Sequence, residues 1–254
     1  MKKVLFYFTA LVMGLALNTS CILSNNGEDE PEYVVSYGCL IDDGGVGYRN
    51  CIVTDSGLHM IIYESNVAQE AINNQKERVL ANYTILSGPD EYGDYYIRLN
   101  AFYNLLTDEI IPSKYLTEEQ KKNLGDDPIN VTSATISAGY LNMPMIALYG
   151  ENNKETAHKL QLVYNMEEST EHKYVFDLYH NAYTDKNGTL AVGMYSSFPI
   201  KHIIPQGDPD KSYDVEVRWK WYQGSSVGNC GVTGIYSPGN KAIVQLTGTY
   251  GSQM

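Results

Sequence analysis

The chain has 254 residues, a formal net charge of −12 at pH 7 and 22 tyrosines. Nucleic-acid phosphates and anionic lipid headgroups repel such an acidic protein, so the composition argues against nucleic-acid binding. Aromatic and β-branched residues fit a pleated, half-buried surface, and this composition favours β structure. We expect most tyrosines to lie in protein cores, and a sugar-stacking surface is the alternative.

Residues 1–20 have the pattern of a bacterial export signal. Lys2 and Lys3 precede an apolar run over residues 4–17, which is too short to span a bilayer comfortably. A short polar stretch then leads to Cys21, an order that resembles the lipid-attachment site of bacterial lipoproteins. We therefore expect a lipidated Cys21 that holds the protein in the cell envelope, at the outer membrane.

Residues 21–32 are expected to form a flexible acidic tether. The segment 24–31 has little to bury and several charges, so nothing favours its folding. An acidic run behind a lipidated cysteine also resembles the signal that sends lipoproteins of Bacteroides-type bacteria to the cell surface. This resemblance implies surface display.

A period of two residues begins at Tyr33 and predicts five strands. They cover residues 33–41, 48–55, 59–64, 78–87 and 95–103. Five closely spaced strands suit a small closed barrel, which leaves few open edges. Residues 66–77 can form a short helix between the third and fourth strands. The predicted barrel domain covers residues 33–112.

Cys39 and Cys51 flank a glycine-rich loop symmetrically about Gly45. If that loop closes a symmetric hairpin, the two cysteines lie directly opposite each other, with Cα atoms about 4.5 to 5.5 Å apart. A disulfide can span this distance, and an exported protein favours it. A bulge in the loop would shift the register and prevent the bond. The pattern therefore predicts a Cys39–Cys51 disulfide that depends on the hairpin register.

The strand pattern stops at Pro112. Thr117 and Gln120 have the spacing of a capping box, which predicts a short helix that ends near Gly125. A capped helix followed by a proline turn suits a rigid connector. We assign residues 113–128 to it.

Strand periodicity returns over residues 129–254 and predicts about seven strands. The candidate strands are 129–140, 160–166, 174–180, 190–200, 214–221, 232–236 and 241–249. This number and the turn signals between the strands suit a β-sandwich. The face that carries Trp219 and Trp221 is expected to form its core.

Two sequence patterns suggest nucleophiles and are better explained otherwise. The segment 224–228 fits a hydrolase nucleophile elbow, but the residues after it lack the helical period that this motif requires. We interpret the segment as a loop between two strands. Cys230 lies among glycines without a local catalytic signature, which is typical of an inert thiol.

The sequence predicts no metal site and no cofactor. The five histidines lack a paired ligand spacing, and zinc requires three or four close ligands. These histidines are His59, His158, His172, His180 and His202. Three carboxylates at Asp208, Asp210 and Asp214 could attract a hard cation, but the same residues are common in turns. We favour a turn.

Several segments resemble the NigD-like proteins of Bacteroides-type bacteria. Those that resemble the N-terminal half are 77–85, 94–97 and 105–110, and those that resemble the C-terminal half are 127–131, 139–142, 158–163 and 218–221. The resemblance covers most of the mature chain. It implies an all-β protein with an N-terminal five-stranded OB-like barrel, a short connecting helix and a C-terminal seven-stranded β-sandwich. The family offers no established catalytic residues to carry over.

These observations favour a lipid-anchored, non-catalytic binding or interaction module of the cell envelope. Its partner would be an envelope protein or a glycan, and Tyr92, Tyr95 and Tyr96 near a predicted hairpin tip are candidate sugar contacts. The alternative is an envelope hydrolase or accessory enzyme with an acidic cleft between the domains, formed by residues such as Asp126 and Asp127. A bacteriocin-associated role, such as self-protection, follows only from the family name.

Overall fold

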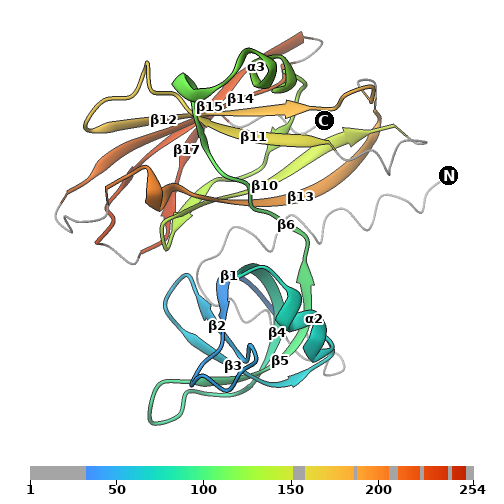
Figure 1. Cartoon of the computed structure of the whole chain (residues 1–254), viewed down its shortest axis with the longest axis vertical. Coiled ribbons are helices and arrows are strands. Elements are labelled where there is room, and N and C mark those ends of the chain that lie inside the picture. The colour runs from blue at the N-terminus through green and yellow to red at the C-terminus, as the bar shows by residue number, and fades with distance from the viewer. Residues whose placement is uncertain are drawn as a thin grey trace, which may run out of the picture.

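The computed structural model describes residues 33–150, 158–185, 188–205, 211–223, 226–239 and 242–249. The predicted signal, Cys21 and the tether lie outside the described residues. The chain forms two β domains, a small barrel and a larger sandwich (Figure 1). No helix of the described ranges is long and apolar enough to cross a membrane.

The first domain is a closed five-stranded barrel. Its strands are β1 (Tyr33–Ile41), β2 (Cys51–Thr54), β3 (His59–Ser65), β4 (Arg78–Ser87) and β5 (Tyr95–Tyr103). They close in the order β1-β2-β3-β5-β4, and β3 and β5 are parallel. Inward side chains such as Leu40, Ile52 and Leu99 are at most 1% exposed. The helix α2 (Gln69–Asn74) buries Ile72 against this core. The predicted barrel and short helix are confirmed.

The β1–β2 hairpin is not symmetric about Gly45. Cys39 lies opposite Val53, and Cys51 lies opposite Ile41. The two cysteines are therefore diagonal neighbours, whose Cα atoms are about 7 to 8 Å apart in such a ladder. A disulfide does not span that distance. The predicted register is wrong, and both Cys39 and Cys51 are free thiols.

Hydrogen bonds within the β1–β2 loop explain this register. The Asp42 carboxylate accepts the backbone N–H groups of Val46 and Gly47 at 2.8 and 2.9 Å. The side-chain oxygen of Asn50 accepts the N–H of Asp43 at 2.7 Å. Side-chain caps of this kind compete with backbone pairing. The centre of the hairpin therefore moves to Val46.

The second domain is a sandwich, and its described residues form two six-stranded sheets. The first sheet contains β16 (Val244–Gln245), β9 (Thr135–Ser137), β10 (Tyr140–Tyr149), β13 (Leu190–Pro199) and β6 (Leu105–Leu106), with β8 (Asn130–Val131) beside β10. The second contains β17 (Thr247–Thr249), β15 (Ser226–Tyr236), β14 (Tyr213–Gln223), β12 (Lys173–Asn181), β11 (Lys159–Tyr164) and β7 (Ile111–Pro112). Trp219 and Trp221 lie in the shared core, as predicted. The sandwich is confirmed, but it has more strands than the seven expected.

The periodicity of the sequence did not predict the long strand β10, because both faces of this strand are covered. Leu141 and Met143 enter the sandwich core. Tyr140 and Asn142 point the other way and are nevertheless buried, because they face the barrel. Alternation of burial returns only near the strand end, where Ile146 is half-buried. A strand buried on both faces shows a continuous apolar run rather than a period of two.

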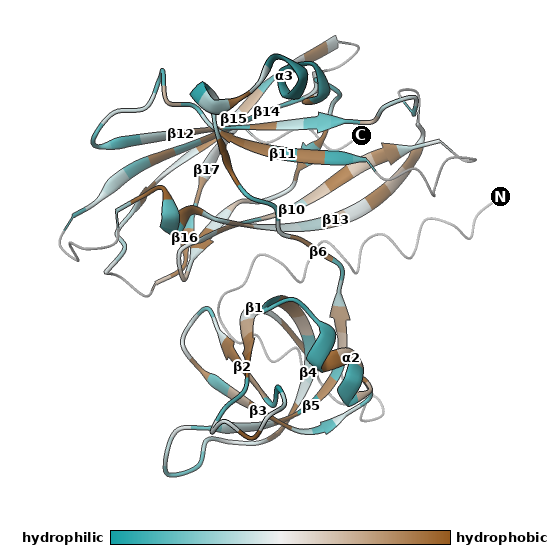
Figure 2. Ribbon diagram, in the orientation of Figure 1, coloured by the Kyte–Doolittle hydropathy of each residue, from teal (hydrophilic) through white to brown (hydrophobic). Residues whose placement is uncertain are grey.

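The chain leaves the barrel earlier than expected. The two-residue strands β6 and β7 pair in parallel with β13 and β11 of the sandwich, so the barrel ends at Tyr103 rather than at Pro112. Strands of two residues are too short to show a period. Beyond them come a 3₁₀ turn, η1 (Ser113–Tyr115), and α3 (Glu118–Asn123), whose capping box at Thr117 and Gln120 is confirmed. The short helix α3 is hydrophilic and has no buried residue (Figure 2).

Candidate functional site

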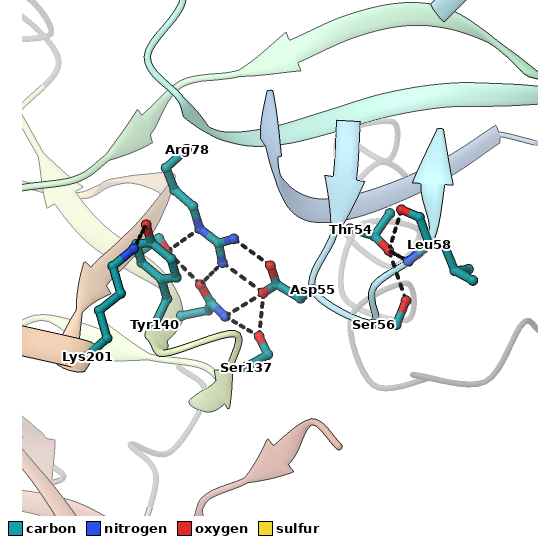
Figure 3. A network of polar contacts seen from close by, with 10 residues as sticks. Thr54, Asp55, Ser56, Leu58, Arg78, Ser137, Tyr140 and Lys201 are labelled. Atoms are coloured by element: carbon teal, nitrogen blue, oxygen red, sulfur yellow. Dashed lines mark hydrogen bonds and ion pairs between the residues drawn. The ribbon is translucent and has the colours of Figure 1, made fainter. Parts of the chain in front are cut away.

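Arg78 on β4 reaches from the barrel into the sandwich (Figure 3). Its guanidinium donates to both oxygens of the Asp55 carboxylate at 2.5 and 2.8 Å, and to Oδ1 of Asn142 at 2.8 Å. Its Nε donates to the Ser197 hydroxyl at 2.8 Å. Arg78 and Asp55 are 5% and 9% exposed. One buried cation therefore binds a carboxylate of its own domain and two acceptors of the other domain.

Sandwich side chains complete this network, which we call the domain junction. Ser137 donates its hydroxyl to Asp55, and the Asn142 amide donates to Ser137 at 2.8 Å. The Tyr140 ring lies 4.1 Å from the Arg78 guanidinium carbon. Burial is the largest single effect on the pKa of Arg78 and lowers it, but the hydrogen bonds and the charge of Asp55, with smaller contributions from Cys39 and Tyr140, together outweigh burial and the net pKa is raised. The junction thus holds a buried ion pair whose partners fix how the two domains meet.

A groove of about 770 Å³ lies over the outer face of the second sandwich sheet, between β12, β14, β15 and the connector. Arg218 is one of its charged residues. Its Nε lies 2.6 Å from the Glu216 carboxylate, and its Nη2 lies 2.8 Å from that of Glu168. These contacts lower the pKa of both glutamates. Lys173 adds an ion pair to Glu216 at 2.6 Å. We call this set the surface ladder.

The predicted acidic pair lines this groove and does not lie between the domains. Asp126 forms an ion pair with Lys220 of β14. The Asp127 carboxylate accepts the backbone N–H of Ala182 at 2.9 Å, and its own N–H donates to the carbonyl of His180 at 3.0 Å. Both aspartates therefore attach the connector to the sandwich. The expected interdomain cleft around them is wrong.

His158, His180 and Asp185 form a buried chain that the sequence did not predict. Nε2 of His158 lies 3.2 Å from the Asp185 carboxylate, and Nδ1 of His158 lies 3.0 Å from Nε2 of His180. Nδ1 of His180 lies 3.0 Å from the carbonyl of Pro128. These residues come from separate segments around β11 and β12, so no local spacing signals them. Within the described ranges, no group of three side chains has metal-binding geometry.

This histidine chain is buried, because His158, His180 and Asp185 are each at most 8% exposed. Burial lowers the pKa of His180, and the neighbouring His158 lowers it further. The Tyr149 ring stacks on His158 with a centroid distance of 3.7 Å. The chain joins the Pro128 connector to two loops of the sandwich.

The three candidate sugar contacts do not share one surface. Tyr95 is half-buried and packs against the barrel core. Tyr96 lies on the outside, where its hydroxyl donates to Asp90 at 3.1 Å. Its ring meets Tyr63 edge to face, with centroids 6.2 Å apart. Tyr92 and Tyr63 are 81% and 72% exposed. The sequence missed Tyr63 because β3 and β5 become neighbours only in the closed barrel.

The loop that presents Tyr92 is ordered by one carboxylate. Asp90 accepts the backbone N–H groups of Tyr92 and Asp94 at 2.9 and 3.0 Å. These bonds lower the pKa of Asp90, and the Asp94 N–H contributes most. Gly93 closes the turn with a φ of 88°, a value that favours glycine. Tyr63, Tyr92 and Tyr96, which we call the tyrosine face, therefore include an exposed ring on a preorganised loop.

The remaining predicted sites concern the chain between β13 and β15. Gln223 pairs with Ser226 in an antiparallel β14–β15 hairpin, so residues 226–228 of the predicted loop belong to strand β15 and the expected loop is shorter than 224–228. Residues 224 and 225 themselves lie outside the described residues, as do Asp208 and Asp210 of the predicted acidic turn. Cys230 is 5% exposed, within β15.

Residues 112–229 match the model of a protein family described as the NigD-like C-terminal β-sandwich domain. No protein with a curated description matches the chain.

Three crystal structures from Bacteroides-type bacteria share the fold. A NigD-like immunity protein from Bacteroides caccae is 18% identical with a TM-score of 0.64, and the match covers 84% of this chain and 100% of that one. A candidate toxin-related protein from Parabacteroides distasonis is 22% identical with a TM-score of 0.61, over 82% and 94%. A candidate lipoprotein from Bacteroides fragilis is 10% identical with a TM-score of 0.56, over 81% and 96%. At these identities the likeness concerns the fold alone.

Proposed function

Because residues 112–229 of this chain belong to the NigD-like C-terminal β-sandwich domain family, we propose that the protein is a lipid-anchored module of the bacterial cell envelope that binds a ligand without chemical turnover. The binding role extends beyond what the family describes. It rests on one observation, the tyrosine face on the outside of the barrel.

The tyrosine face has the composition of a carbohydrate site. Tyr63 and Tyr92 expose flat aromatic rings, which can stack on the apolar face of a sugar. The carboxylates of Asp90 and Asp94 lie in the same loop and can accept hydrogen bonds from sugar hydroxyls. Five-stranded OB barrels are known to bind oligosaccharides, but a fold does not by itself assign a ligand. A glycan is therefore the ligand that the side chains favour.

Alanine variants test the glycan directly. We expect Tyr63→Ala and Tyr92→Ala each to weaken glycan binding roughly two- to tenfold, because an aromatic contact contributes about 0.5 to 1.5 kcal/mol. The measurement is a glycan array followed by titration of the bound sugar. Tyr115→Ala is the matched control, because Tyr115 is 65% exposed but lies in the connector. Binding that survives both barrel variants contradicts the assignment.

The envelope location rests on the leader pattern and Cys21, with support from a structural neighbour described as a candidate lipoprotein. We expect Cys21→Ser to abolish lipid attachment and to release the protein from membranes. Mass spectrometry and membrane fractionation measure the two effects, and Cys39→Ser is the control that retains the lipid. A mass that differs only by the replacement of sulfur with oxygen in Cys21→Ser contradicts lipidation. The acidic run in residues 24–31 supports display on the cell surface, which protease treatment of intact cells tests.

The hydrolase alternative loses its structural basis in the interdomain cleft. Asp126 and Asp127 already hold the connector to the sandwich. Turnover of a polysaccharide or peptide that a point mutation in this chain abolishes would overturn the non-catalytic role. The immunity function of the Bacteroides caccae protein belongs to that protein, because the likeness concerns only the fold.

A further inference from the structure

The barrel exposes apolar side chains where β1 begins and β4 ends. The set, which we call the apolar seam, consists of Tyr33, Val34, Val35, Ile85 and Leu86, with exposures of 65%, 37%, 38%, 42% and 39%. No charged residue occurs in β1, and Arg78 is the only one in β4. Arg78 lies at the opposite end of the strand, in the domain junction. The seam residues themselves are thus uncharged, at the end of the ladder away from Arg78, and the charge nearest to them in the register is Arg98 of β5, opposite Thr84.

The strand register distributes the seam over both sides of the β1–β4 pair. Tyr33 lies opposite Thr84, and Val34 lies opposite Tyr83. Two residues further along β4, Ile85 therefore sits diagonally beside Val34, on the same side of the sheet. Leu86 sits diagonally beside Tyr33, on the other side. Diagonal neighbours in an antiparallel pair are close enough for large side chains to meet.

The position of the seam along the chain indicates what covers it. Residue 32, which precedes Tyr33, ends the proposed tether from Cys21. A fully extended chain spans at most about 3.3 to 3.6 Å per residue, so the eleven residues 22–32 reach roughly 40 Å at most. A lipid on Cys21 therefore keeps the seam close to the bilayer.

We propose that the apolar seam rests on the membrane interface and orients the anchored protein. This inference depends on the proposed lipidation of Cys21. Tyrosine is enriched at membrane interfaces, where its ring is buried and its hydroxyl remains hydrated. A seam of this size binds a bilayer weakly by itself, but the tether supplies a high local concentration. Tyr96 on β5 lies opposite Ser87 of β4, the residue after Leu86, so the tyrosine face adjoins the seam.

Tryptophan fluorescence tests the contact in the full-length lipidated protein. The protein is reconstituted into neutral phosphatidylcholine vesicles whose acyl chains carry bromine, which quenches tryptophan on contact. Trp219 and Trp221 are 3% and 2% exposed and provide a constant background. We expect several-fold stronger quenching of the added emission in Leu86→Trp than in Ile235→Trp. Ile235 is the matched control, because it is 64% exposed but lies on the sandwich.

Each result has a defined meaning. Selective quenching of L86W and of the milder Y33W variant supports the membrane contact. Equal quenching of L86W and I235W, or none in either, overturns it even if mass spectrometry shows the lipid on Cys21. Absence of the lipid removes the anchor, and both proposals fall. If Ile85→Ser instead dissociates a dimer in detergent, the seam binds a second copy and the membrane contact is wrong.

Discussion

The domain junction and the surface ladder use the same chemistry in different surroundings. In the junction, Arg78 binds Asp55 with side chains that are 5% and 6% exposed. In the ladder, Arg218 binds Glu216 and Glu168 with side chains that are 30%, 19% and 54% exposed. Water screens the second set, whereas a buried ion that loses its partner has no solvent to replace it. Burial, rather than the number of ion pairs, decides which arginine the fold depends on.

Removal of the junction carboxylate is expected to have the largest effect. Asp55→Ala leaves the Arg78 cation buried without its counter-ion, which costs about 3 to 5 kcal/mol of unfolding free energy. Urea denaturation measures this loss. The double variant Asp55→Ala/Arg78→Met removes both charges, and we expect it to recover part of the stability. A loss below about 1 kcal/mol in the single variant would contradict the importance of the junction.

The buried histidine chain is expected to make stability depend on pH. The folded-state pKa of His180 lies below its usual value, so the unfolded chain binds this proton more readily. Stability from His180 is therefore complete above about pH 6.5 and is lost as the pH falls toward the folded-state pKa. Asp127, His158 and Asp185 also face this chain, so the variant His180→Gln is needed to isolate the contribution of His180 to the pH dependence. If the unfolding free energy of H180Q falls with pH as much as that of the unmodified protein, the pH dependence belongs to other groups.

The surface ladder is expected to contribute little. Arg218→Ala removes two ion pairs that water already screens, so we expect a loss of about 1 kcal/mol or less. The same urea titration, repeated at low and high salt, measures it. Salt should reduce the difference between R218A and the unmodified protein, because exposed pairs are screened. A loss as large as that of Asp55→Ala would show that exposure does not separate the two networks.

Burial is also expected to decide which cysteine thiol reacts. We expect no effect on the stability of the protein. Burial raises the pKa of Cys51 to about 11, and the nearby Asp43 adds to this shift. The half-buried Cys39 should react with a thiol reagent in the native protein, whereas Cys51 should react only after unfolding. Mass spectrometry of the labelled peptides measures both. If unfolded protein labels at neither position until a reductant is added, the two cysteines are bonded.

Local patterns predicted the barrel well because the side chains that face its core recur at every second position, as at Val79, Ala81 and Tyr83 of β4. β4 and β5 have the predicted bounds, and α3 has its predicted cap. The pattern failed where tertiary contacts override it. β10 is buried on both faces, so its sequence lacks alternation. The two-residue segments β6 and β7 are strands only because they pair with β13 and β11 of the sandwich.

The candidate site was less predictable because its members are brought together by closure of the folds. Tyr92 and Tyr96 were identifiable from the hairpin tip, but Tyr63 joins them only through the parallel pairing of β3 with β5. His158 and His180 are separated by 22 residues and meet across an antiparallel strand pair. The Cys39–Cys51 prediction failed because backbone N–H groups of the loop donate to the Asp42 carboxylate, and the hairpin centre lies one residue further along the chain than predicted.

The junction also imposes an order on folding. Arg78 and Asp55 can meet as soon as the barrel closes, but Ser197 is 119 residues further along the chain than Arg78. β6 likewise can pair only when its partner β13 is present, although β6 directly follows the barrel in sequence. A chain that emerges N-terminus first would form its barrel early, with the Arg78–Asp55 pair still hydrated. Desolvation of that pair would then be a late event, completed only when most of the sandwich has been synthesised and can pack on the barrel.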